Sequence, residues 1–141
     1  MFREVKGETL KRILLVDDDV AILRGLKPAL TREGYDVVTT SNPTEVSSMI
    51  SRESFDLIIL DVRMPAKSGV EVFDELKKIN PDMRFLFITA FLKSFSVESN
   101  AMLKRWQELL PDGNTDVLYK PFKLDDLYLK VEGLIGPAKG G

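Results

Sequence analysis

The sequence of 141 residues contains neither cysteine nor histidine. Without cysteine the chain has no disulfide framework, no thiolate nucleophile and no cysteine-based zinc site. This absence fits a reducing cytosol. Without histidine the chain cannot carry Ser-His-Asp or Cys-His catalysis, and it cannot be the histidine-phosphate donor of a relay.

A concentrated basic face and long apolar runs are missing as well. The 20 basic and 22 acidic side chains leave a net charge of −2, whereas nucleic-acid-binding modules usually gather basic residues on one face. The longest apolar runs, such as 57–60 and 85–88, are too short to cross a bilayer. The N-terminus lacks the apolar stretch of a signal peptide. We therefore expect a cytoplasmic protein that neither binds nucleic acid directly nor enters a membrane.

What the sequence does contain is an alternation of apolar runs of strand length with segments of helical period. The predicted strands are 12–16, 35–40, 55–60, 84–89 and 115–119. The first predicted helix begins near Ala21 and ends at Gly34, and others cover about 42–51, 70–79, 96–110 and 124–135. Pro28 lies inside the first helical pattern, which predicts a bend near residues 24–28.

This alternation predicts an α/β fold. Five strands joined through helices favour a doubly wound parallel sheet with right-handed crossovers and helices on both faces. The apolar share of 44% is enough for one core. We expect an N-terminal extension over 1–10, one domain over 11–135 and a disordered tail of linker composition over 136–141. Such sheets bind ligands beyond the carboxyl ends of their strands.

Polar residues stand at those strand ends: Asp17, Asp18 and Asp19 after the first strand, Asp61 after the third, Thr89 closing the fourth and Lys120 after the fifth. Each has an ordinary explanation when taken singly. An aspartate before a helix is often an N-cap, threonine favours strands, and lysine is common on surfaces. Together, however, these side chains would meet in one crevice of the predicted sheet.

Such a set of side chains suits phosphoryl transfer. Crowded carboxylates raise each other's pKa unless a cation is present, and hard oxygen ligands with room for water and phosphate suit Mg²⁺. One carboxylate can then attack phosphorus and become an aspartyl-phosphate. An ammonium group neutralises charge on the transferring oxygens, and a hydroxyl can donate a hydrogen bond to the phosphate.

Four blocks resemble the signature blocks of response-regulator receiver domains, in the family's order: 13–19 (ILLVDDD), 56–65 (DLIILDVRMP) with Ser68-Gly69, 88–90 (ITA) and 120–122 (KPF). The resemblance covers about residues 11–135. It implies a flavodoxin-like (βα)5 domain with strand order 2-1-3-4-5. Each block alone is weak, but all four in order make a chance match improbable.

The resemblance also implies a role for each strand-end residue. It makes Asp61 the phosphoacceptor, Thr89 the switch hydroxyl and Lys120 the partner of the acceptor or its phosphate, with Mg²⁺ held by Asp17, Asp18, Asp61 and the backbone carbonyl of Arg63. It further implies a cis Lys120–Pro121 bond, whereas Asp19 has no matching role and is expected to cap the first helix. The partner would be a sensor histidine kinase, and the domain would catalyse only its own phosphorylation and dephosphorylation. The output protein or domain is not identified, and a phosphorylation-linked homodimer stays open.

Two features depart from the family's pattern. The aromatic residue usually found three positions before the lysine is replaced by Val117, while Tyr119 directly precedes Lys120. Residues two apart in a strand share a face, so Tyr119 should lie on the side of Val117. The stretch from Thr89 to Lys120 is also longer than expected by roughly eight to ten residues, which would extend the fourth helix. Trp106 in this stretch either remodels the family's output face or packs into the core.

Three other functions compete with a phosphoacceptor. A receiver-like interaction module that works without phosphorylation would explain both departures. A phosphatase of the haloacid-dehalogenase type would need Asp-x-Asp-x-Thr, but residue 21 is alanine. A flavin-binding domain would need phosphate-cradling loops, and an acidic crevice would repel that phosphate. The sequence does not decide between a stand-alone protein and a piece of a longer one.

Overall fold

The computed structural model describes residues 4–5, 8–62, 64, 67–90 and 113–138. Within them, five parallel strands form one sheet in the order β4-β3-β5-β6-β7, which is the predicted order 2-1-3-4-5. The strands are β3 (Arg12–Val16), β4 (Asp36–Thr40), β5 (Leu57–Asp61), β6 (Phe85–Ala90) and β7 (Thr115–Lys120). All four neighbouring pairs are parallel. The predicted flavodoxin-like receiver fold is thereby confirmed.

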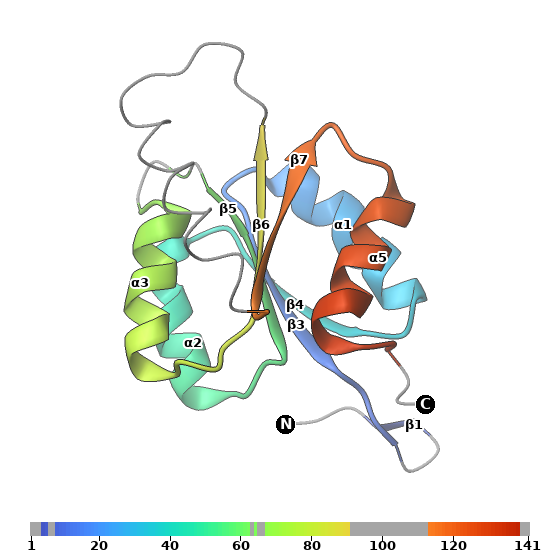
Figure 1. Ribbon diagram of the computed structural model, residues 1–141, viewed down its shortest axis with the longest axis horizontal. Coiled ribbons are helices and arrows are strands. Elements are labelled where there is room, and N and C mark those ends of the chain that lie inside the picture. Colours follow the sequence, from blue (N-terminus) through green and yellow to red (C-terminus); the bar gives the residue numbers. More distant parts are fainter. Residues whose placement is uncertain (1–3, 6–7, 63, 65–66, 91–112, 139–141) are drawn as a thin grey trace.

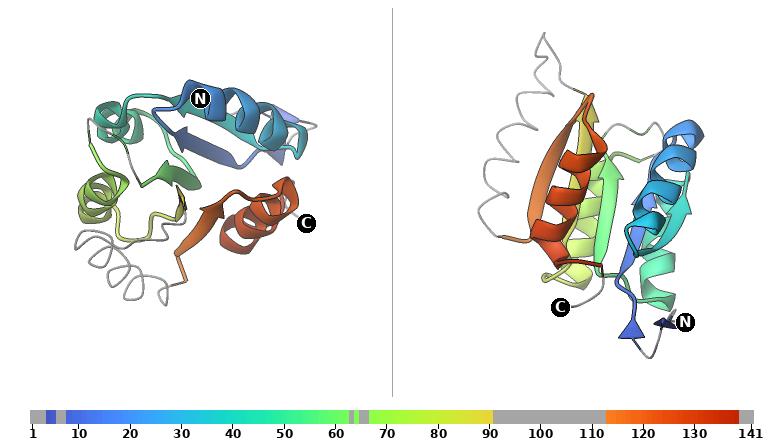
Figure 2. Two further views of the ribbon diagram at one scale, coloured as in Figure 1. Left: turned by 90° about the horizontal axis from the view of Figure 1, so that it is seen from above. Right: turned by 90° about the vertical axis from the view of Figure 1, so that its right-hand side faces the viewer.

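Helices cover both faces of this sheet (Figures 1 and 2). α1 (Val20–Arg32) and α5 (Leu124–Ile135) lie on one face, and α2 (Val46–Arg52) and α3 (Gly69–Ile79) lie on the other. Alternate residues of β3 enter separate cores: Ile13 and Leu15 pack on the α1–α5 side, and Leu14 and Val16 pack on the α2–α3 side. Because both faces are buried, the strands are continuous apolar runs, as parallel strands require.

The helix starts follow local capping chemistry. The carboxylate of Asp19 accepts a hydrogen bond from the Ala21 amide at 2.9 Å, so the expected cap of α1 is present. The side chain of Ser68 caps α3 in the same way, by accepting from the amide of Glu71. These caps place both helix starts directly beyond the strands β3 and β5.

One helical prediction stays a prediction and one needs correction. α1 is a continuous helix of 13 residues that contains Pro28, and the bend expected near residues 24–28 stays a prediction. The helix predicted over 42–51 is instead a 3-10 turn, η1 (Pro43–Glu45), followed by α2. The Asn42 side chain accepts from the Thr44 amide there, and this tight local bond favours a 3-10 start.

Both ends of the chain contain structure that the sequence analysis lacks. β1 (Glu4–Val5) and β2 (Glu8–Thr9) pair as a short antiparallel ladder within the expected extension. Beyond α5, the Gly136 carbonyl accepts from the Tyr35 hydroxyl at 3.1 Å, and Ala138 is buried in the α1–α5 core. Residues 136–138 therefore pack against the domain. In the part of the chain that the structure describes, none of the helices has the length and apolar character needed to cross a bilayer.

Candidate acidic phosphoryl-transfer site

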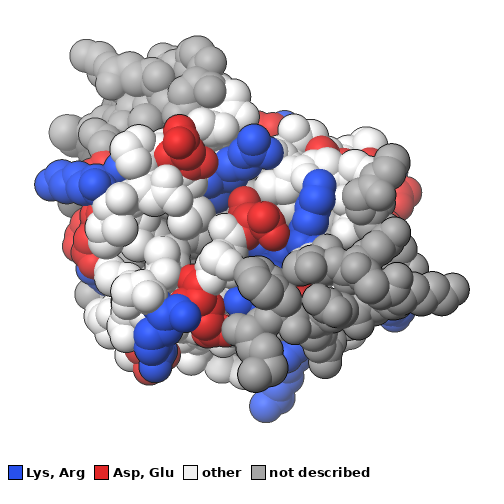
Figure 3. Space-filling model, turned by 90° about the horizontal axis from the view of Figure 1, so that it is seen from below, with Lys and Arg blue, Asp and Glu red and all other residues white. Residues whose placement is uncertain are grey.

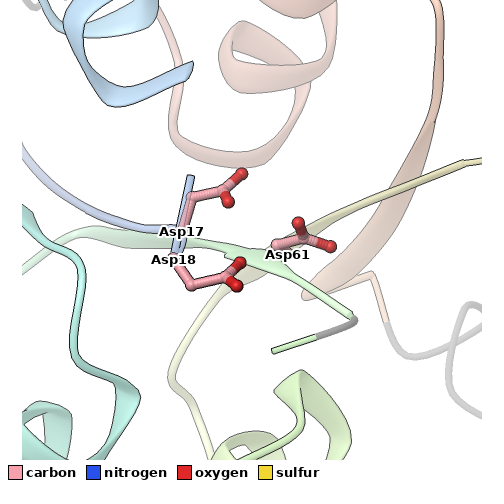
Figure 4. A group of neighbouring side chains, drawn as sticks. All are labelled: Asp17, Asp18 and Asp61. Atoms are coloured by element: carbon pink, nitrogen blue, oxygen red, sulfur yellow. The ribbon is translucent and has the colours of Figure 1, made fainter. Parts of the chain in front are cut away.

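Three carboxylates meet at the carboxyl ends of the adjacent strands β3 and β5 (Figure 4). Asp17 and Asp18 follow β3, and Asp61 is the last residue of β5. One carboxylate oxygen from each lies within 4.8 Å of the other two. β3 and β5 are the strands between which the chain's direction of winding reverses, so this cluster occupies the switch point where doubly wound sheets bind ligands.

The three aspartates differ in exposure and in partners. Asp17 is 2% exposed, and its carboxylate accepts from the Asp19 amide at 2.9 Å. Asp61 is half-buried, and Asp18 is exposed. The pKa of Asp17 is raised to about 6, chiefly by burial and to a smaller extent by the nearby charge of Asp61. The Asp19 amide and Lys120 act in the opposite direction.

Lys120 supplies a positive charge to this cluster. Its Nζ atom lies 3.4 Å from Oδ2 of Asp61 and 3.7 Å from Oδ2 of Asp17. β7 ends at Lys120 two strands away from Asp61, so the contact depends on the sheet rather than on neighbouring sequence. The Lys120–Pro121 peptide bond is cis, as expected.

Thr89 lies near the end of β6 and is 6% exposed. The register pairs Asp61 with Ile88, so Thr89 lies one residue beyond the level of Asp61 on the adjacent strand. Tyr119 is the register partner of Thr89 on β7. Val117 packs in the α2–α3 core and Leu118 in the other, as alternation along a strand requires; Tyr119 is 43% exposed.

Some predicted features lie outside the described residues. They are the backbone carbonyl of Arg63, the extended fourth helix and Trp106.

Sequence reasoning does not explain Gly69, the first residue of α3. A Cβ atom at this position would lie 2.5 Å from the backbone oxygen of Asp61, which is closer than side chains approach. Glycine therefore lets the start of α3 pass directly against the end of β5. A glycine in the first turn of a helix, shortly after a strand-end aspartate, is the one sequence signal for this approach.

The donor set suits a hard divalent cation. Carboxylate oxygens with an open, exposed side at Asp18 match the ligands of Mg²⁺, which keeps several waters in protein sites. Fold and site together define a flavodoxin-like domain with an acidic cluster at the switch point.

Comparison with known proteins identifies the family to which this domain belongs. The model of the response regulator receiver domain matches residues 13–132. The response regulator receiver protein CpdR of Brucella abortus is 32% identical over 127 residues, which cover 89% of this chain and 98% of CpdR. This chain belongs to the response regulator receiver domains and is CheY-like. It is thus a module of two-component signalling rather than a conventional enzyme, and its family implies a histidine kinase as partner.

Longer relatives and solved structures agree with this family. The alginate biosynthesis transcriptional regulatory protein AlgB of Pseudomonas aeruginosa is 35% identical over 126 residues, which cover 89% of this chain but only 26% of AlgB. The chain thus spans about a quarter of that protein's length. A receiver domain from Clostridium thermocellum superposes with a TM-score of 0.74 at 30% identity, covering 89% of this chain and 94% of that one.

One solved relative contains the cation in question. The response regulator TrrA of Thermotoga maritima, solved in complex with Mg²⁺-BeF, superposes with a TM-score of 0.68 at 33% identity. The match covers 88% of this chain and 98% of TrrA. The acidic triad of this chain is typical of the magnesium-binding site of receiver domains.

Proposed function

We propose that this chain is a cytoplasmic phosphoacceptor domain, in which Asp61 takes a phosphoryl group from the phosphohistidine of a sensor histidine kinase. The observation that carries the proposal is the contact of Asp61 with both an acid pair and Lys120 at the switch point of the sheet. Phosphoryl transfer needs little from a protein beyond positioning and charge stabilisation, and this cluster supplies both.

The residues would hold Mg²⁺ through Asp17, Asp18, Asp61 and the backbone carbonyl of Arg63. The bound cation would supply neutralisation of the charge on the transferring phosphoryl oxygens. Without metal, burial raises the pKa of Asp17 to about 6, and a cation bound beside this carboxylate would favour its ionised form.

In the proposed transfer, a carboxylate oxygen of Asp61 forms the new bond to phosphorus. The phosphorus–nitrogen bond of phosphohistidine breaks, and its electron pair leaves on the imidazole nitrogen. Lys120, 3.4 Å from Asp61 before transfer, then pairs with the phosphoryl oxygens. Water later hydrolyses the acyl phosphate and restores the carboxylate.

The phosphate adds about two negative charges next to the end of β6. The hydroxyl of Thr89 would donate to it, and this new bond would bias a two-state equilibrium that an output partner reads. Because Val117 packs in the core in place of the family's usual aromatic residue, Tyr119 is the aromatic side chain placed to respond beside Thr89.

The test is to incubate the protein with Mg²⁺ and acetyl phosphate and to record its intact mass. A phosphate adduct that requires Mg²⁺ is expected in the wild type and should be absent from Asp61→Asn. Asp56→Asn is the matched control, because Asp56 lies before the other end of β5 and accepts from the Arg12 amide instead. An adduct that persists in Asp61→Asn would mean that another residue accepts the phosphate.

The second candidate function is an interaction module that works without phosphorylation. The buried Val117, where the family usually has an aromatic residue, is the observation that favours it. It would be supported if neither acetyl phosphate nor any of a panel of histidine kinases gave an adduct with the wild type.

A further inference from the structure

The segment that follows Asp61 joins β5 to α3, and its two ends are hydrogen-bonded to each other. We name its described residues, Val62, Met64, Lys67 and Ser68, the acceptor loop; they lie between β5 and α3. The Gly69 amide donates to the Val62 carbonyl at 3.0 Å, and Gly69 passes so close to Asp61 that no side chain fits between them. The two ends of the acceptor loop are therefore held together next to the backbone of Asp61, the proposed phosphoacceptor.

A second attachment holds this loop from the side. The Lys67 ammonium in the acceptor loop donates to Oε2 of Glu75 on α3. The other oxygen of the same carboxylate, Oε1, accepts from the hydroxyl of Ser47 on α2. Glu75 thus joins three elements, and these hydrogen bonds, that from Lys67 above all, lower the pKa of its carboxyl.

Stability alone is a weak explanation for this arrangement. The side chains of Lys67 and Glu75 are 22% and 39% exposed, and ion pairs of such exposure contribute little to the free energy of unfolding. A carboxylate that uses both oxygens on two different elements is fixed in direction, however, and fixes its partners in turn. Catalytic groups depend on such supporting contacts for their placement.

We propose that Glu75 is a positioning residue of the phosphoryl-transfer site: it holds Lys67 against α2 and α3, and thereby fixes the acceptor loop and the end of β5 that carries Asp61. This inference rests on the proposed function. Glu75 itself contacts neither the acid cluster nor Lys120 through any hydrogen bond or ion pair found in the described residues, so it acts only through the loop.

The test compares Mg²⁺ affinity, measured by calorimetry, in Glu75→Gln and Lys67→Met. Both variants are expected to bind Mg²⁺ about three- to tenfold more weakly, because each releases the acceptor loop. The Gly69 amide should also exchange its hydrogen faster in both variants without metal, as seen by NMR. Glu53→Gln is the matched control, since Glu53 also accepts from a cation, Arg12, but at the opposite end of the sheet.

The signs of the two effects separate positioning from simple electrostatics. A through-space charge effect would weaken Mg²⁺ binding in Glu75→Gln but strengthen it in Lys67→Met. Opposite shifts, or shifts no larger than in Glu53→Gln, would overturn the role of Glu75 while the wild type still bound Mg²⁺ and accepted phosphate. A wild type that did neither would overturn the proposed function, and the inference with it.

Discussion

The two ends of the parallel sheet bury charged side chains in opposite ways. At the amino end, Arg12 is 4% exposed, and each of its three guanidinium nitrogens donates a hydrogen bond. It donates to Asp36 at 3.1 Å, to Glu53 at 2.9 Å and to the Ser54 carbonyl at 3.1 Å, and it lies over the ring of Phe55. Figure 3, which views the molecule from this end, shows acidic and basic side chains interspersed.

At the carboxyl end, acids outnumber the lysine that faces them. Lys120 approaches both Asp17 and Asp61, while Asp18 brings a third carboxylate to the same place. The pKa of Asp17 is raised, mainly because its carboxylate is buried. The amino end thus satisfies its buried charge and stabilises the fold, whereas the carboxyl end keeps an excess of negative charge that a cation and a phosphoryl group can use.

The largest effect is expected from a substitution that removes the Arg12 network at the amino end of the sheet. Arg12→Met should lower the free energy of unfolding by about 3–5 kcal/mol, because it leaves the carboxylates of Asp36 and Glu53 without their buried cation. Urea unfolding measures this change. Arg24→Met is the control, since Arg24 is exposed on α1, and it should change stability little. Equal losses in both variants would show that the amino-end network adds nothing.

A smaller effect is expected at Gly69, where the start of α3 lies directly against the backbone of Asp61. Gly69→Ala should cost about 1–3 kcal/mol, because its Cβ would overlap the Asp61 carbonyl and push α3 away from β5. Gly25→Ala in α1 meets no atom within 4 Å and should instead stabilise the protein by about 0.5–1 kcal/mol. Thermal unfolding of the two variants tests this difference in sign, and a stabilised Gly69→Ala protein would contradict it.

A third effect, a gain in stability, is expected from a substitution of Asp17 in the acidic cluster. The folded state holds the Asp17 proton up to about pH 6, above the usual pKa of an unfolded aspartate, so this group lowers stability as the pH rises between about 4 and 6. In EDTA at pH 7.5, Asp17→Asn should therefore be more stable than the wild type by about 1–2 kcal/mol. At pH 4 the difference should nearly vanish. Urea unfolding at both pH values would contradict this if the variant were the less stable at pH 7.5.

The contrast between the two ends also separates what the sequence predicts from what it does not. The strands and the meeting of Asp17, Asp18, Asp61 and Lys120 follow from apolar runs that end in polar residues, and the family resemblance adds the strand order. Parallel strands bring their carboxyl ends together whatever the details of packing, so these residues could be placed from the sequence.

Contacts between distant parts of the chain could not be placed in the same way. The Arg12 network joins β3 to residues 24 and 41 positions away, and Ser47, Lys67 and Glu75 meet only because α2 packs beside α3. The burial that raises the pKa of Asp17 likewise depends on how closely the finished fold covers it. The β1–β2 pairing lacks the alternating apolar pattern that marks longer strands.

The measurement that tests the cation site most directly is the free energy of unfolding with and without Mg²⁺. At pH 7.5, Mg²⁺ at ten times its dissociation constant should raise the stability of the wild type by about 1.4 kcal/mol. The gain should shrink below about pH 6, as Asp17 takes up its proton. Asp18→Asn should lose the gain, while Asp19→Asn should keep it, because the Asp19 side chain caps α1 and the amide that donates to Asp17 remains in the variant. A wild type indifferent to Mg²⁺, or an equal gain in Asp18→Asn, would contradict a cation site at the carboxyl end of the sheet.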